Sequence, residues 1–245
     1  MNGRLSSAWL LALALLGGSC PPARAADSSS NSVEASAAVL SSPAVSAPAL
    51  RGTASVQAAP YWQDKLLLDK AWALPVASRY KTHIEFQHNL TFCGPSSIAN
   101  VGHSLGSTLD QRAVLEDTGV STTLGYLPSG LTLDELAGVA QRRFAPGHVT
   151  VWRGLSLDAF RQHLRQANEL GRRYIVNFSR APLFGQGGGH HSPIAGYLAA
   201  QDLVLVLDVN QSFGPWLVKP ERLLEAMNTV DSQSGKLRGL LLIEP

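Results

Sequence analysis

The chain has 245 residues, with 20 Lys and Arg, 18 Asp and Glu, and a formal net charge of +2 at pH 7. This balance excludes the strongly basic surface of nucleic-acid-binding proteins and of proteins that attach to anionic membranes. Two cysteines in the whole chain exclude a disulfide-stabilised scaffold, and they exclude a metal site built from a cluster of thiolates.

The first 25 residues have the pattern of a secretory signal peptide. Arg4 supplies a short basic start, residues 9–16 form an apolar core, and small residues surround the expected cleavage point between Ala25 and Ala26. The apolar core is too short to span a membrane. We therefore expect a secreted or periplasmic bacterial protein without a transmembrane segment.

Cys20 lies near the end of this signal, where a bacterial lipoprotein carries its lipid-modified cysteine. A lipoprotein signal needs a large aliphatic residue three positions earlier, and this chain has Gly17 there, so a lipid anchor is not expected. Cleavage would also remove Arg4 and Arg24 and leave 18 basic against 18 acidic residues. The mature protein is then formally neutral, and no nucleic-acid partner is expected.

Residues 26–60 consist mainly of Ser, Ala, Val and Pro and contain no aromatic residue. Such a segment buries too little apolar surface to offset the entropy lost on ordering, so it is predicted to be a flexible tether. Residues 61–245 remain, which is the size of one ordinary domain. No signal for the oligomeric state is present.

Apolar spacing and capping residues predict five helices in this domain, at residues 93–105, 109–117, 132–142, 156–170 and 220–228. Thr132, three residues before Glu135, predicts a capping box, and Ser156 predicts a second N-cap. Apolar runs predict four strands, at residues 173–179, 194–199, 203–209 and 239–243. The predicted helices come first along the chain and the predicted antiparallel strands come later, and this order favours an α+β fold.

Cys93 is the sole cysteine once the signal is removed, so an internal disulfide is excluded. A lone thiol is either an inert buried hydrophobe or a reactive group, and Cys93 alone does not decide between them. Pro95 suits a first helical turn, and Ile98 and Val101 continue at helical spacing. Cys93 is therefore predicted at a helix N-terminus, where the helix dipole favours the thiolate.

Two further residues complete a catalytic order along the chain. His190 follows three consecutive glycines at the start of an apolar run, and Asp208 stands near the end of the next apolar strand. An Asp at a strand end is usually a turn residue. The order of Cys93, His190 and Asp208 nevertheless matches a relay in which histidine deprotonates the thiol and the carboxylate orients the imidazole.

Five separated motifs resemble the catalytic domain of phytochelatin synthases, in particular the short bacterial form, which belongs to the papain-like cysteine-protease clan. The similarity runs from about Tyr61 to the C-terminus. The motifs are Gln87 six residues before Phe-Cys93-Gly, Val-Asn-Phe-Ser-Arg at 176–180, Gly-Gly-His-x-Ser-Pro at 188–193, Leu-Asp-Val at 207–209, and the segment 226–239. The resemblance implies a papain-like α+β fold, with the nucleophile helix packed against an antiparallel sheet.

The resemblance also implies catalytic roles. It makes Cys93 the nucleophile, His190 the general base and Asp208 the orienting group, in the place held by Asn in papain itself. It makes Gln87 the side-chain donor of an oxyanion hole that the backbone N–H of Cys93 completes. His191 is the neighbour that competes with His190. The family pattern selects the histidine directly after the glycines, and strand alternation predicts that only one of the two faces Cys93.

The implied substrate is glutathione, which donates its γ-glutamylcysteinyl part to the thiol and releases glycine. Arg180, Asp231 and Arg238 occupy positions that resemble the contacts to the charged α-amino acid head. A guanidinium binds a carboxylate bidentately, and a carboxylate binds an ammonium group. The alternative for each of the three is an ordinary surface salt bridge, which contributes about 0–1 kcal/mol.

The implied enzyme is a glutathione γ-glutamylcysteinyltransferase with deglycylating hydrolase activity, since water or a second glutathione can accept the acyl group. The chain lacks a cysteine-rich C-terminal extension, so no tightly bound cofactor and no protein metal site are expected. Cadmium or zinc is expected as a thiolate complex of glutathione. The remaining histidines outside 190–191 are scattered singly, which indicates packing: His83, His88, His103, His148 and His163.

Two other classes stay open. A papain-clan peptidase or amidase acting on another peptide needs a cleft wide enough for a polypeptide, whereas a tripeptide needs a closed pocket. A non-catalytic thiol-binding or metal-binding module is the third reading, and the intact set of Gln87, Cys93, His190 and Asp208 speaks against it.

Overall fold

The computed structural model describes residues 54–123 and 127–245. The predicted signal peptide, residues 1–25, and the predicted tether up to residue 53 lie outside the described residues. The first described element is the short 3₁₀ helix η1 (Val56–Ala58), in which Val56 is buried among apolar side chains.

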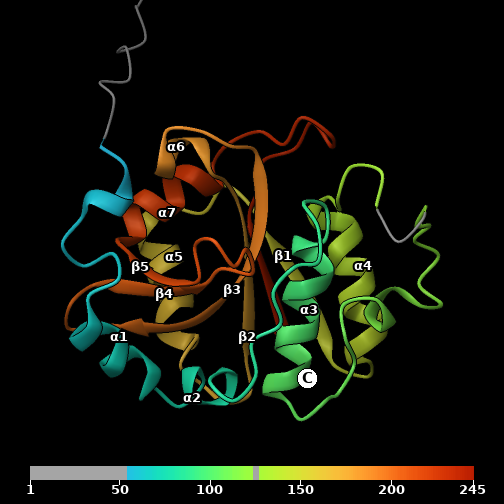
Figure 1. The fold of residues 1–245 in the computed structure, drawn as a ribbon, viewed down its shortest axis with the longest axis horizontal. Coiled ribbons are helices and arrows are strands. Elements are labelled where there is room, and N and C mark those ends of the chain that lie inside the picture. The colour runs from blue at the N-terminus through green and yellow to red at the C-terminus, as the bar shows by residue number, and fades with distance from the viewer. Residues whose placement is uncertain (1–53, 124–126) are drawn as a thin grey trace, which may run out of the picture. The chain divides into compact units, whose positions relative to one another are not determined.

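A six-stranded antiparallel sheet forms the centre of the fold, in the order β1-β6-β2-β3-β4-β5 (Figure 1). The middle strands β2, β3 and β4 are buried on both faces, which explains the continuous apolar run of β4 and the apolar second half of β3. The strands are β1 (His148–Trp152), β2 (Arg173–Ser179), β3 (Gly189–Leu198), β4 (Leu203–Leu207), β5 (Pro215–Val218) and β6 (Leu240–Glu244).

Helices cover both faces of this sheet, and each group shares one apolar cluster with it. Ile175 of β2 belongs to the first cluster and its neighbour Tyr174 to the second, as strand alternation requires. The first group is α1 (Lys65–Trp72), α2 (Ala77–Tyr80), α3 (Cys93–Ser104) and α4 (Leu133–Phe144). The second is α5 (Leu157–Gln166), α6 (Ala181–Phe184) and α7 (Pro220–Met227). The predicted α+β class, with the helix of Cys93 packed on the sheet, is confirmed.

Local capping signals were reliable guides to helix starts. Thr132 caps α4 and forms the predicted capping box with Glu135. Ser156 caps α5 through its bond from the N–H of Ala159. The predicted end of α5 at residue 170 is wrong, since Asn168 instead bonds the backbone of β3 through its side-chain amide.

Two other expectations need correction. The predicted helix at 109–117 is only a 3₁₀ turn, η2 (Ala113–Leu115). The carboxylate of Asp110 accepts the N–H groups of Arg112 and Ala113, and such local bonds compete with helix formation. Strands β1 and β5 were missed because both are short strands at the sheet edges. No helix in the described ranges has the length and apolar character needed to cross a bilayer.

Candidate active site

Cys93 is the first residue of α3, as predicted, and its side chain is buried. Phe92 occupies the N-cap position, and no side chain caps the helix there. The first N–H groups of a helix have no acceptor within the helix, so the positive end of α3 lies at the thiol. This position stabilises a thiolate and provides backbone donors for an oxyanion.

His190 stands at the start of β3, and Asp208 follows the last residue of β4. The Nε2 atom of His190 lies 2.9 Å from Oδ1 of Asp208. His190 is also hydrogen-bonded to the thiol of Cys93. Since Nε2 faces Asp208, the other ring nitrogen is the one available to the sulfur. The structure therefore brings the three predicted relay residues together in the predicted order.

Asp208 is fully buried and accepts hydrogen bonds from four other groups. In addition to His190, the backbone N–H of Asn210 and the indole N–H of Trp216 contact its oxygens at 2.9 and 3.1 Å. The Nη2 atom of Arg180 lies 2.8 Å from each oxygen. Burial raises the pKa of Asp208, but the charge and hydrogen bond of His190, followed by the charge of Arg180, bring it below its ordinary value.

Arg180 therefore has a different place from the one expected. Its guanidinium is buried, pairs with Asp208 and lies 4.0 Å over the ring of Phe213. It is not among the residues that line the cavity at Cys93. We assign Arg180 as a residue that positions the relay, because its Nη2 atom is held by both oxygens of Asp208, while its Nη1 atom is buried without a hydrogen-bond partner. Its expected role as a substrate contact stays a prediction.

His191 also contacts the thiol, so the expectation that only one of the two histidines faces Cys93 is wrong. Its Nδ1 atom lies 3.7 Å from Sγ of Cys93. Strand alternation does not separate the two rings, because both residues are at the very start of β3, next to the beginning of α3.

Asn177 determines the tautomer of His191. Its Nδ2 atom lies 3.0 Å from Nε2 of His191 and 3.3 Å from the carbonyl oxygen of His190, and both contacts require the amide nitrogen as donor. Nε2 of His191 must then accept, so Nδ1 carries the hydrogen and points it at Cys93. His191 is thus a neutral donor to the sulfur, whereas His190 is the ring paired with the carboxylate.

Together these contacts favour a thiolate–imidazolium pair. Burial alone raises the pKa of the Cys93 thiol, but hydrogen bonds from His190 and His191, together with the positive charge of His190, outweigh it and hold that pKa well below its usual value. Burial lowers the pKa of His190, yet the charge and hydrogen bond of Asp208 raise it overall. Both directions favour a proton on His190 and a thiolate on Cys93, which is the form in which the sulfur can act as a nucleophile.

A cavity of about 320 Å³ opens beside Cys93. Its wall includes His191, Asn177, Asp231 and Arg238. The volume is at the lower end of the range for small-molecule sites, which suits a short peptide better than a polypeptide.

Asp231 and Arg238 are paired in that wall, with Nη2 of Arg238 lying 3.3 Å from Oδ1 of Asp231. Arg238 is anchored by further bonds to the hydroxyl of Thr229 and the carbonyl of Val230. A Cβ at Gly189 would lie 3.0 Å from the Arg238 guanidinium, so the glycine leaves room for this close approach. A carboxylate and a guanidinium side by side match the two charges of an α-amino acid head.

Gln87 is held close to the relay by its backbone, whose N–H donates to the carbonyl of Val209 at 2.8 Å, directly after Asp208. Its side-chain Nε2 donates to the carbonyl of Asn89 at 2.9 Å. An amide nitrogen carries two hydrogens, so one remains for an oxyanion. Its role in the oxyanion hole stays a prediction.

Sequence reasoning missed the roles of Asn177, Trp216 and His191. Asn177 carried a usable signal, since it is a single polar residue within the apolar run of β2. Trp216 is fully buried, and its bond to Asp208 depends on the pairing of β4 with β5, which the sequence alone does not show.

Among solved structures, the peptidase domain of Streptococcus ComA aligns with 66% of this chain and 99% of its own, at 17% identity and a TM-score of 0.45. A C39-like peptidase from Bacillus anthracis aligns with 67% of this chain and 94% of its own, at 15% identity and a TM-score of 0.47. Both TM-scores are low, and the family assignment does not rest on them.

Sequence relatives are more informative. A wheat (Triticum aestivum) glutathione gamma-glutamylcysteinyltransferase 1 is 42% identical over 90 residues, 36% of this chain and 18% of its own length. A fission yeast (Schizosaccharomyces pombe) glutathione gamma-glutamylcysteinyltransferase is 29% identical over 118 residues, 47% of this chain and 28% of its own length. The chain thus matches well under a third of each relative. The sequence profile described as Phytochelatin synthase matches residues 62–240, which include every relay and cavity residue above, and the chain therefore belongs to the phytochelatin synthase family.

Proposed function

We propose that this protein transfers the γ-glutamylcysteinyl group of glutathione, with Cys93 as the acyl carrier. The observation that carries the proposal is the geometry at the sulfur. A thiol contacted by His190 and His191 opens on a small cavity whose wall holds Asp231 and Arg238. The site thus combines an activated nucleophile with groups for a zwitterionic head, and its relatives are named for this reaction.

In the first half-reaction, the Cys93 thiolate attacks the carbonyl carbon of the Cys–Gly peptide bond. The carbonyl π electrons move to oxygen, and the resulting oxyanion lies at the N-terminus of α3, where the N–H of Cys93 and the amide of Gln87 are its donors. His190 then gives its proton to the glycine nitrogen as the C–N bond breaks. Glycine leaves, and γ-glutamylcysteine is bound to Cys93 as a thioester.

In the second half-reaction, neutral His190 accepts a proton from the incoming nucleophile. Water gives free γ-glutamylcysteine, whereas the α-amino group of a second glutathione gives (γ-Glu-Cys)₂-Gly. The sulfur leaves as a thiolate in both cases, and the thiolate–imidazolium pair is restored. Both outcomes share one acyl-enzyme, so the partition depends on which acceptor reaches it first.

The cavity wall supplies the recognition of the donor. The α-carboxylate of the γ-glutamyl head pairs with Arg238, and its ammonium group pairs with Asp231. In the free protein these two side chains face each other at 3.3 Å, so the substrate exchanges one internal ion pair for two external ones.

The remaining parts of the proposal concern cofactor and location. No cofactor is held tightly in the reaction, and cadmium or zinc enters as a thiolate complex of glutathione, in which the metal is part of the substrate. The protein is exported through its N-terminal signal to the periplasm or the exterior, where it meets glutathione.

The test is mass spectrometry of the protein incubated with glutathione, with and without cadmium or zinc, alongside Cys93→Ser. Release of glycine and γ-glutamylcysteine by the wild type alone supports deglycylation, and (γ-Glu-Cys)₂-Gly adds the synthase reaction. If glutathione survives while Cys93 is readily alkylated, the nucleophile is right and the substrate is wrong. Other peptides and amides are then the substrates to test.

A further inference from the structure

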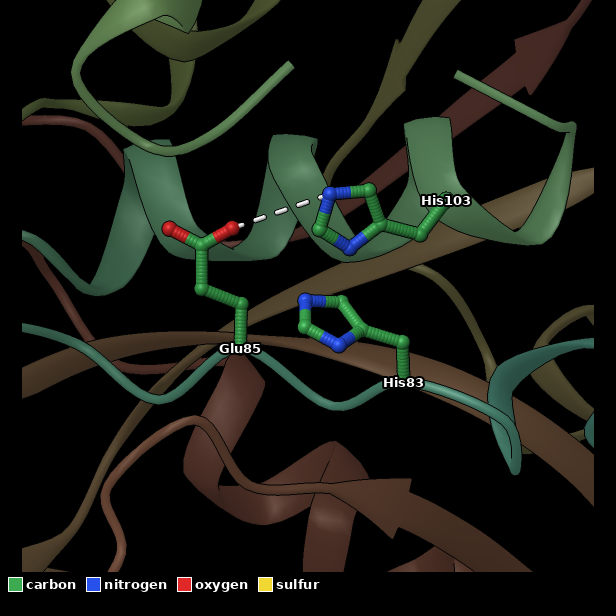
Figure 2. Close-up of side chains that lie close together, drawn as sticks. All are labelled: His83, Glu85 and His103. Carbon is green, nitrogen blue, oxygen red and sulfur yellow. Dashed lines mark ion pairs between the residues drawn. The ribbon is translucent and has the colours of Figure 1, made fainter. Parts of the chain in front are cut away.

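A second group of chemically competent side chains lies away from Cys93, at the other end of α3 (Figure 2). His83 and Glu85 belong to the segment between α2 and α3, and His103 is in the last turn of α3. One ligand atom from each of the three lies within 4.8 Å of the others. Ten residues of helix, about 15 Å, separate His103 from Cys93, so the group is distinct from the active site.

His103 offers a nitrogen that its surroundings leave free. Its Nε2 atom lies 3.1 Å from the carbonyl oxygen of Leu109, which can only accept, so Nε2 carries the hydrogen. Nδ1 then holds a lone pair, and this atom is buried without a hydrogen-bond partner. Metal-binding histidines typically donate their other ring N–H to a carbonyl in this way.

Glu85 is oriented for the same purpose. Its Oε1 atom accepts two hydrogen bonds of 2.8 Å from Gln111, one from the backbone and one from the side chain. Its Oε2 atom lies 3.7 Å from Nε2 of His103, which is too long for a hydrogen bond, so this oxygen lies beside the imidazole without being bonded to it. The carboxylate is therefore fixed through one oxygen and presents the other to the imidazole (Figure 2).

His83 completes the group from the surface. Its ring meets the ring of His103 edge-on, with 4.6 Å between centroids, and the residue is exposed. Ligands on one zinc ion lie about 3–4 Å apart because each is about 2 Å from the metal. The side chains must close by about 1 Å, which rotation of the exposed His83 allows. An open cavity borders His103 and gives an ion a way in.

We propose that His83, Glu85 and His103 bind one divalent cation of borderline softness, with Zn²⁺ the best match and water as the fourth ligand. Two imidazoles and one carboxylate suit zinc, whereas Mg²⁺ and Ca²⁺ require mainly oxygen ligands. The site differs from the thiolate-held metal of the substrate complex, and it departs from the expectation that His83 and His103 are scattered packing residues.

The bound ion links α3 to the segment that carries Gln87. That segment is already bonded to the helix, since the backbone carbonyl of Glu85 accepts from Ser96 and Asn100 at 2.6 and 2.8 Å. An ion on Glu85 and His103 adds a further link two residues before Gln87. The bound metal therefore stabilises the native state by mass action.

The experiment is a calorimetric titration of Zn²⁺ into untagged Cys93→Ser protein, because the thiolate and its histidines could otherwise bind zinc themselves. We expect one ion per chain, and at least tenfold weaker binding in His83→Ala and in His103→Ala. His148→Ala, at an exposed histidine in β1, is the matched control and leaves the affinity unchanged. Co²⁺ in place of Zn²⁺ is expected to give the visible absorption of a tetrahedral ion, which both ligand variants lose.

His83 is exposed, so His83→Ala tests the proposal even if His103→Ala fails to fold. Binding that survives His83→Ala unchanged, or Zn²⁺ that binds no more tightly than about millimolar, would overturn the proposal. Both readouts are independent of glutathione turnover, so they stand or fall separately from the proposed transferase reaction.

Discussion

His191 gives the sharpest test of how the thiol is activated. Its Nδ1–H lies 3.7 Å from Sγ of Cys93, and Asn177 holds its other nitrogen at 3.0 Å. Replacing it by Phe keeps a flat ring of similar size in the same packing space but removes the donor. Replacing it by Gln keeps a donor. The pair of variants therefore separates hydrogen bonding from packing.

The expected size follows from the contact. A hydrogen bond to a charged group contributes about 1.5–3 kcal/mol, and a 3.7 Å contact to sulfur belongs at the lower end of that range. Since about 1.4 kcal/mol corresponds to one pKa unit, His191→Phe is expected to raise the pKa of Cys93 by about one unit. His191→Gln is expected to raise it by less than about half of that.

The assay is the rate of iodoacetamide alkylation of Cys93 as a function of pH, followed by mass spectrometry. The thiolate is the reactive species, so the midpoint of the rate profile reports the thiol pKa. His190→Ala is the internal reference, because it removes the ring paired with Asp208 and must also move the midpoint upward.

An unchanged midpoint in His191→Phe would refute the assignment of His191 as a donor to the sulfur. A rise of equal size in His191→Gln would refute it as well, since packing rather than hydrogen bonding would then be responsible. Either result would leave His190 as the sole imidazole that acts on Cys93.

Three further predictions concern stability and pH. Arg180→Met leaves the buried Asp208 without its guanidinium partner and is expected to lower the unfolding free energy by about 3–5 kcal/mol in urea denaturation; a loss under about 1 kcal/mol contradicts the pairing. Thr132→Ala removes the α4 cap and should cost about 1 kcal/mol with unchanged glycine release. The kcat/KM for glycine release should rise as pH passes upward through the lowered pKa of Cys93 and fall through the raised pKa of His190; a single ascending limb near the ordinary thiol pKa would contradict the ion pair.

Local signals in the sequence carried most of the correct fold predictions. The start of α3 at Cys93 and the capping box at Thr132 depend on residues within one helical turn of each other. The strand at 173–179 was predictable from its apolar residues 174–176 and 178, which are rich in β-branched and aromatic side chains. The wrong prediction at 109–117 also has a local cause. The apolar spacing favoured a helix, but the carboxylate of Asp110 accepts hydrogen bonds from the N–H groups of Arg112 and Ala113.

The sequence predicts which residues form the site, but it does not predict which of them contact one another. Cys93, His190 and Asp208 could be recognised because each stands at the start or end of a predicted element. The pairing of Arg180 with Asp208 was not predictable, because a basic residue directly after a strand has the same sequence pattern whether it faces a cavity or a buried carboxylate. His83 and His103, twenty residues apart, become neighbours only through the packing of a loop on α3.

The buried Arg180 also explains how Asp208 can stand where papain itself has an asparagine. Asn orients the imidazole without adding charge, whereas a carboxylate in the same place adds a negative charge at a buried position. Here Arg180 contacts both carboxylate oxygens, so the two residues together are formally neutral. The site then contains thiolate, imidazolium, carboxylate and guanidinium in alternating sign, and each charge has an opposite neighbour. The imidazolium is stabilised by Asp208 without a net buried charge, which is the condition for an ion pair at Cys93 in a dry interior.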